Sequence, residues 1–168
     1  MHVNIVAIDP KILVGKRLQM SLSKDRTPML WQNFMPYRNS IKHRTSSALI
    51  SLQDYKNPFC LQDFTTTTEF DKWAAVEVSK VQDLPENMET YTISGGLYAV
   101  FTYVGTPQGF RNFLSDIYNE WFPSADYILD HRPHFEILGD KYRNNHPDSE
   151  EEVWIPVKKK IKTSFTDL

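Results

Sequence analysis

Two stretches of the chain share one pattern, and they read Thr106-Pro107-Gln108-Gly109-Phe110-Arg111-Asn112-Phe113-Leu114 and Thr27-Pro28-Met29-Leu30-Trp31-Gln32-Asn33-Phe34-Met35-Pro36. Each begins with Thr-Pro, which is typical of a helix N-cap followed by proline at the first helical position. In the later stretch, apolar residues continue at helical spacing as far as Trp121, and Pro123 ends the helix. In the earlier stretch, Pro36 kinks or ends the helix. The pattern therefore predicts two helices related by an internal repeat.

Strand-like segments surround both predicted helices in the order strand, helix, strand, strand. They are rich in β-branched and aromatic residues, which favour strands. They cover residues 3–20, 47–52 and 70–81 around the first helix, and residues 90–104, 135–138 and 152–157 around the second. The sequence therefore predicts two βαββ units.

The two units meet near the polar turn at residues 84–87. Repeat one covers about residues 1–84 and repeat two about 88–159, so that a single domain spans 1–160 and a C-terminal tail follows at 161–168. Two βαββ units related by a pseudo-twofold axis predict an α+β fold with antiparallel sheets and a helix on one face of each. We expect the faces opposite the helices to form a ligand cleft between the halves, because pockets favour such interfaces.

Composition and charge narrow the class of protein. The chain has 168 residues, of which 40% are hydrophobic and 13% aromatic, too apolar for a disordered chain. The formal net charge of −2 argues against non-specific binding to nucleic acid or anionic lipid. The single cysteine, Cys60, excludes an internal disulfide and a cysteine-rich zinc module. The sequence has neither a signal peptide nor a long apolar run, so we expect a cytoplasmic protein without a membrane partner.

The last predicted strand, Glu152-Val153-Trp154-Ile155-Pro156-Val157, alternates with period two. Its three β-branched residues share the face that suits a helix-covered core, and Glu152 and Trp154 share the other. A strand of the first half alternates in the same way and places Trp73 and Glu77 on the corresponding face. Each half thus offers a carboxylate and an indole on the face opposite its helix.

A carboxylate beside aromatic rings suits an organic cation, because the rings attract the charge and the carboxylate neutralises it. The candidate ligand-binding residues are these four side chains and two tyrosines of the preceding strands, namely Glu152, Trp154, Glu77, Trp73, Tyr98 and Tyr91. The alternative interpretation stays open, since glutamate and tryptophan on a sheet face are most often ordinary surface residues.

Other chemically suggestive residues carry less weight. His131 and His134 flank a proline and have no third ligand at suitable spacing, so no metal is expected. Gly95-Gly96 lacks the downstream lysine of a phosphate-binding loop, and Cys60 lacks a histidine partner. We expect no cofactor. We also expect no direct binding of nucleic acid, because both predicted helices are committed to a core.

Four segments together resemble the GyrI-like small-molecule-binding family, and they are Tyr98-Ala99-Val100-Phe101-Thr102, Glu120-Trp121-Phe122-Pro123, Pro133-His134-Phe135-Glu136 and the strand from Glu152 to Val157. The resemblance is strong over about residues 88–159 and looser over 1–84. The family includes effector-binding domains of AraC-type and MerR-type multidrug regulators and stand-alone DNA gyrase inhibitory proteins. No helix-turn-helix region is visible in this sequence, so we expect a stand-alone binding protein.

The resemblance implies a duplicated βαββ fold in which the carboxylate of Glu152 recognises the charge of a lipophilic or cationic aromatic ligand. Some members resemble hydrolases of electrophilic cyclopropane-bearing compounds, and in that alternative Glu152 is the catalytic acid/base. A third alternative is an inhibitory protein that interacts with gyrase. A non-catalytic small-molecule-binding role is the favoured hypothesis; DNA gyrase, a separate regulator and a second copy of the chain are the other candidate partners.

Overall fold

Helical segments follow both Thr-Pro sequences, as the repeat predicts. Thr106 occupies the N-cap position of the later helix and Arg26 that of the earlier one, and neither side chain makes a capping hydrogen bond. The earlier segment consists of α1 (Thr27–Phe34) and a 3₁₀ turn, η1 (Met35–Ser40), while the later one consists of α2 (Pro107–Asp116), a π-helical stretch, η2 (Ile117–Trp121), and α3 (Phe122–Ser124).

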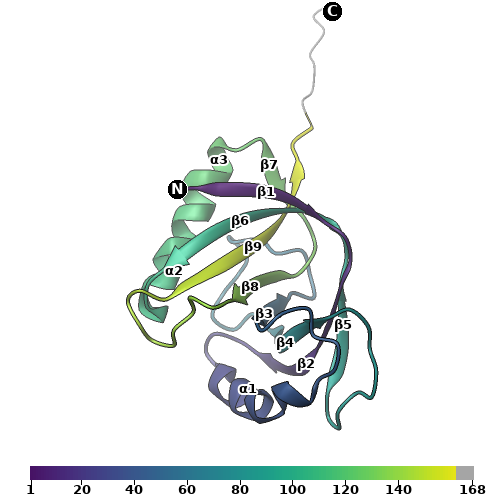
Figure 1. Cartoon of the computed structure of the whole chain (residues 1–168). Coiled ribbons are helices and arrows are strands. Elements are labelled where there is room, and N and C mark those ends of the chain that lie inside the picture. Colours follow the sequence, from purple (N-terminus) through teal and green to yellow (C-terminus); the bar gives the residue numbers. More distant parts are fainter. Residues whose placement is uncertain (162–168) are drawn as a thin grey trace, which may run out of the picture.

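The computed structural model, which describes residues 1–161, contains one antiparallel sheet of nine strands (Figure 1). The strands are β1 (Val3–Ile8), β2 (Lys11–Met20), β3 (Leu49–Asp54), β4 (Phe70–Val78), β5 (Glu89–Ile93), β6 (Gly96–Val104), β7 (Tyr127–Leu129), β8 (His134–Leu138) and β9 (Glu150–Lys159). Their order is β1-β6-β9-β8-β3-β4-β2-β5, and β7 pairs with β9 outside this path. The two predicted sheets are thus joined into one.

The strand order is symmetric about the β3–β8 pair, where Ser51 lies opposite Glu136. On either side of this pair, β9, β6 and β1 correspond to β4, β2 and β5. The outermost strands are exchanged, because β1 precedes β2 in the chain but pairs with β6, whereas β5 precedes β6 but pairs with β2. The proposed boundary near residue 84 therefore divides the sequence into repeats but does not divide the sheet into halves.

Both helical segments pack on the same face of the sheet, which we call the helix face. α1 covers a cluster on β2 and β4 that includes Val14, Phe70 and Val76. α2 and η2 cover a second cluster on β6 and β9, including Phe101 and Ile155. The two clusters lie on either side of β3 and β8, so the middle of the helix face is free of helix-packed core.

The opposite face of the sheet, which we call the far face, is not open. Its buried side chains come from β2, β3, β4, β5, β6 and β8 and form a single cluster. Leu13, Leu52, Tyr98 and Phe135 in this cluster are all 0% exposed. The curvature of the sheet (Figure 1) brings strands from both halves together there and fills the space in which the strand pattern predicts a cleft. Within the described residues, no helix combines the length and apolarity needed to cross a bilayer.

Candidate functional site

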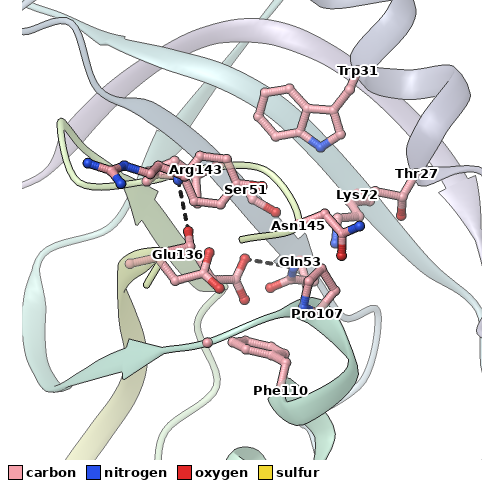
Figure 2. A pocket seen from close by; sticks show the side chains of 15 residues that line it. Thr27, Trp31, Ser51, Gln53, Lys72, Pro107, Phe110, Glu136, Arg143 and Asn145 are labelled. Carbon is pink, nitrogen blue, oxygen red and sulfur yellow. Dashed lines mark hydrogen bonds between the residues drawn. The ribbon is translucent and has the colours of Figure 1, made fainter. Parts of the chain in front are cut away.

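A cavity of about 220 Å³ lies between α1 and α2 over the β3–β8 pair. Figure 2 shows Trp31 of α1 and Phe110 of α2 on opposite sides of a group of polar side chains. The cleft between the two halves is therefore present, but it lies on the helix face rather than the far face. The physical reason is that the helices cover the flanks of the sheet and leave its central strands uncovered.

The polar floor of the cavity follows from the alternation of β3 and β8. Ser51 and Gln53 of β3 point to the helix face, and the apolar residues between and beside them point to the far face. On β8, Glu136 points to the helix face between Phe135 and Ile137, which belong to the far-face cluster. Two strands with one apolar and one polar side thus build both a core and a site.

Glu136 is 9% exposed and accepts a hydrogen bond from Nε2 of Gln53 at 3.1 Å (Figure 2). Gln53 itself is only 9% exposed. Withdrawing a carboxylate from water is costly unless charged or hydrogen-bonding partners compensate it. A single amide donor compensates Glu136 only in part, so this side chain provides a strong attachment point for a cationic group.

Glu151 lines the same cavity from β9. The pKa of its carboxyl is raised from 4.5 to about 7, chiefly by burial and also by the negative charge of Glu136, while the positive charge of Lys72 acts in the opposite direction. At neutral pH the Glu151 carboxyl is therefore close to half protonated. A bound cation would favour its ionised form, so occupancy and protonation are coupled.

The remaining polar groups of the cavity come from β4 and from the loop between β8 and β9. Lys72 of β4 lies beside Gln53 in the sheet register. Asn145 of the loop faces the same space (Figure 2), and Arg143 also lines the cavity. The backbone N–H of Arg143 donates to the Ser149 hydroxyl at 2.9 Å, which holds the loop across its own base. The cavity thus contains both signs of charge.

His134, one alternation along β8 from Glu136, belongs to a buried aromatic cluster. Its ring meets Tyr55 and Phe59 edge to face, at centroid distances of 5.2 and 5.1 Å, and its Nδ1 lies 3.4 Å from the Tyr118 hydroxyl. Burial lowers the pKa of His134 to about 3 and raises the pKa values of Tyr55 and Tyr118. His134 is therefore neutral, and residues 1–161 contain no cluster of three or more side chains suited to a metal ion.

The loop between β3 and β4 encloses a second cavity, of about 560 Å³, next to this cluster. Tyr55, Phe59 and Phe64 line it together with Cys60, the lone cysteine. The loop closes on itself through backbone hydrogen bonds from residues 63 and 64 to the carbonyl of Cys60. Lys56, Asp63 and Glu69 also line this second cavity, and it shares no lining residue with the first.

The six sequence-predicted site residues lie away from the cavity. Trp73 and Tyr98 are buried in the far-face cluster, at 4% and 0% exposure. Trp154 stacks on Phe135 of the same cluster at 5.3 Å, and its indole N–H donates to Glu152 at 2.9 Å. A ligand contact by these residues stays a prediction, and the curvature that fills the far face is why the structure does not bring them together with the cavity.

The other two of the six residues also have partners of their own. Glu77 forms an ion pair with Lys11 at 3.1 Å. Tyr91 packs edge to face on Trp73, at a centroid distance of 5.2 Å. Both contacts belong to the far side of the sheet, so neither carboxylate of the predicted pairs faces the cavity.

Sequence reasoning missed Glu136, Glu151 and Lys72. A signal was available, because polar residues alternate with apolar ones along both central strands, at positions 51 and 53 and at positions 134 and 136. Glu151 stands one residue before the predicted Glu152, and a shift of one residue along a strand moves a side chain to the other face.

The fold and the cavity define a duplicated βαββ domain with a mixed-charge, aromatic-walled cavity between its repeats. The chain matches the model of the GyrI-like small molecule binding domain over residues 1–158, and it belongs to this family. No curated protein matches the chain at a significant level.

Solved structures of similar fold include proteins with different roles. SAV2435 bound to tetraphenylphosphonium aligns with a TM-score of 0.70 and 16% identity, over 94% of either chain. The C-terminal domain of EcmrR aligns with a TM-score of 0.68 and 13% identity, over 95% of this chain and 98% of that one. A hydrolase from Listeria innocua aligns with a TM-score of 0.60 and 7% identity, over 93% and 91%. At such identities the likeness concerns the fold alone.

Proposed function

We propose that this protein is a receptor for a lipophilic organic cation, which it holds in the cavity between α1 and α2. The observation that carries the proposal is the pair of carboxylates, Glu136 and Glu151, in a cavity with Trp31 and Phe110 as walls. The rings would cover the apolar body of the ligand and attract its charge, while the carboxylates would neutralise that charge. The tetraphenylphosphonium complex of SAV2435 supports this choice of ligand class.

The electrostatic part of this proposal rests on burial. Because Glu136 is 9% exposed, its attraction for a cation is much less screened than that of a surface carboxylate. The apolar part rests on the two rings. Neither part demands a unique ligand shape, and an effector-binding role for several related compounds is compatible with both.

The size of the cavity sets a further condition. Small-molecule pockets usually measure about 300–1,000 Å³, and this one measures about 220 Å³. A ligand as large as tetraphenylphosphonium would therefore extend beyond the open mouth of the cavity or displace the β8–β9 loop, which contributes Tyr142, Arg143 and Asn145, outward. Either arrangement is compatible with the proposal.

The test compares Glu136→Gln with Glu152→Gln, a matched change on the far face. Titration calorimetry with tetraphenylphosphonium should give a loss of about 1–3 kcal/mol for Glu136→Gln, because a buried counter-charge is removed. Glu152→Gln should bind as the parent does, and neutral triphenylphosphine oxide should bind both variants equally. A loss confined to Glu152→Gln, or an equal loss for the cation and the neutral compound, contradicts the proposal.

A hydrolase is the second candidate, and one observation favours it. Glu151, with its pKa raised to about 7, stands in the same cavity as Glu136, and a carboxyl group that titrates near neutral pH suits acid/base catalysis. Incubation with an electrophilic cyclopropane-bearing compound should then give ring-opened product, and Glu151→Gln should abolish turnover. Saturable binding without product excludes this candidate and leaves the receptor.

Binding of DNA gyrase, of a separate regulator or of a second copy of the chain stays a prediction from the sequence, and so does a cytoplasmic location. Co-purification with gyrase subunits and sedimentation of the purified protein test these partners directly. A role in multidrug response would follow only from regulation by such a partner.

A further inference from the structure

The two repeats contribute opposite charges to the cavity at equivalent positions. Lys72 stands two residues before Ala74, which pairs with Ser51 of β3. Glu151 stands two residues before Val153, which pairs with Glu136 of β8. Because Ser51 and Glu136 face each other at the symmetry axis, Lys72 and Glu151 occupy corresponding sites of the two repeats.

The neighbouring residues of these two sites also differ between the repeats. Gln53 is the neighbour of Lys72 on the adjacent strand, and the corresponding residue of β8 is Leu138. Figure 2 shows Lys72 close to Asn145, on the side of Gln53 away from Glu136. Repeat one thus contributes Lys72 at one end of the cavity, and repeat two contributes Glu136 and Glu151 at the other, together with Arg143 of the β8–β9 loop.

Lys72 has no ion-pair partner in the described part of the chain, although its charge helps to lower the pKa of Asp25. Its ammonium makes no ion pair within 4.0 Å and no hydrogen bond within 3.5 Å there, although Lys11, Arg17, Lys42 and Lys141 all do. It is close enough to Glu151 to lower the pKa of that carboxyl, which shows that the two charges share one field. An unpaired ammonium on the wall of a cavity opposes a simple cation and attracts an anion.

We propose that the natural ligand is zwitterionic, with its cationic group at Glu136 and Glu151 and a carboxylate or similar oxyanion at Lys72. This inference rests on the proposed function, because it assumes that the cavity holds an organic cation. The backbones of β4 and β9 are separated by β3 and β8, that is, by three strand spacings or about 14 Å, and Lys72 and Glu151 reach into the cavity from opposite sides. In a poorly screened cavity, the anionic group converts a repulsion by Lys72 into an attraction.

The experiment uses two phosphonium probes of nearly equal size, butyltriphenylphosphonium and its zwitterionic analogue carboxybutyl-triphenylphosphonium. Each is titrated into the parent protein, Lys72→Met and Lys80→Met, the last being an exposed lysine outside both cavities. Lys72→Met should weaken the zwitterion about tenfold, as expected for one charge-assisted contact. The same change should leave the simple cation equally or more tightly bound, because a repulsive charge is gone.

The readout is the ratio of the two dissociation constants within one variant, so a general loss of stability cancels. Lys80→Met should keep the parental ratio, and Lys72→Arg should keep the preference for the zwitterion. If Lys72→Met has the same ratio as the parent and still binds the simple cation, the proposal of a zwitterionic ligand is wrong. The proposed function is then unaffected. If neither phosphonium binds the parent protein, the proposed function itself fails.

Discussion

Strand β8 presents two surfaces of different composition within five residues. His134 and Glu136 point to the helix face, and Glu136 reaches the cavity. Phe135 and Ile137 point to the far face and join its apolar cluster. β3 divides in the same way, with Ser51 and Gln53 on one side and Ile50 and Leu52 on the other.

The far face contributes mainly to the stability of the fold, and the helix face between α1 and α2 contributes mainly to ligand recognition. The far face gains its free energy from apolar burial, which any well-packed side chains can provide. The helix face between α1 and α2 holds polar groups whose burial opposes folding unless something compensates them. Substitutions on the two faces of one strand should therefore change different properties, and the following predictions test that separation.

The largest effect is expected on the far face. Phe135→Ala removes a side chain that is 0% exposed and should lower the free energy of unfolding by about 3–5 kcal/mol. Denaturant titration measures this loss. The folded fraction should still bind tetraphenylphosphonium within a few-fold of the parent, and a selective loss of binding at unchanged stability would remove the distinction between the faces.

The two half-buried tryptophans give the next contrast. Trp31→Ala removes one wall of the cavity and should weaken binding of cationic and neutral aromatic ligands by about 1–2 kcal/mol. Trp154→Ala removes a ring stacked on Phe135 and should act on stability instead. Calorimetry measures ligand binding by each variant, and thermal unfolding measures the stability of each. Equal binding losses in the two variants would mean that both faces contact the ligand.

Glu151→Gln should stabilise the protein. The unfolded chain releases the Glu151 proton near pH 4.5 and the folded protein only near pH 7, so parental stability falls between these values and stays lower above them. Glutamine carries no ionisable proton and avoids this loss. We therefore expect Glu151→Gln to raise the free energy of unfolding by about 1 kcal/mol at pH 8, less than the full pKa shift would give, because the side chain is partly exposed. The gain should vanish below pH 4.5. A variant less stable than the parent at pH 8 contradicts a raised pKa.

The smallest effect is on the pH dependence of binding. Tetraphenylphosphonium does not titrate, so any change between pH 6 and pH 8 belongs to the protein. Binding should tighten by about threefold as pH rises and Glu151 ionises near pH 7, because its negative charge adds to that of Glu136 and is partly offset by Lys72. Glu151→Gln should flatten the profile. If binding by Glu151→Gln still depends on pH between 6 and 8, another group of the protein titrates there. His134, with a pKa of about 3, is not that group.

Local pattern predicted the elements of the fold well. The Thr-Pro stretches marked both helices, and period-two alternation grouped Val153, Ile155 and Val157 correctly on the helix-covered side. Such signals are local and depend only on neighbouring residues. Exchange of β1 and β5 between the halves depends on pairing over distances of about half the chain, and no local pattern reveals it.

The location of the site depended on curvature, which local pattern does not contain. Alternation shows that Glu152 and Trp154 share a face, but it cannot show that the sheet closes over that face and fills it. Nor can it show that α1 and α2 stop short of β3 and β8. The buried polar residues of these central strands, above all Glu136, were the only local trace of the cavity.

The position of β9 also governs how the chain folds during synthesis. β9 lies between β6 and β8, yet within residues 1–161 it follows every other strand. While the ribosome still holds its residues, β6 and β8 each present an unpaired edge, which attracts other extended chains. Sheets that depend on such distant partners fold slowly, and their nascent forms are prone to aggregate. Slower dilution into folding conditions, or a chaperone that shields strand edges until residue 159 is released, should therefore raise the yield of native protein.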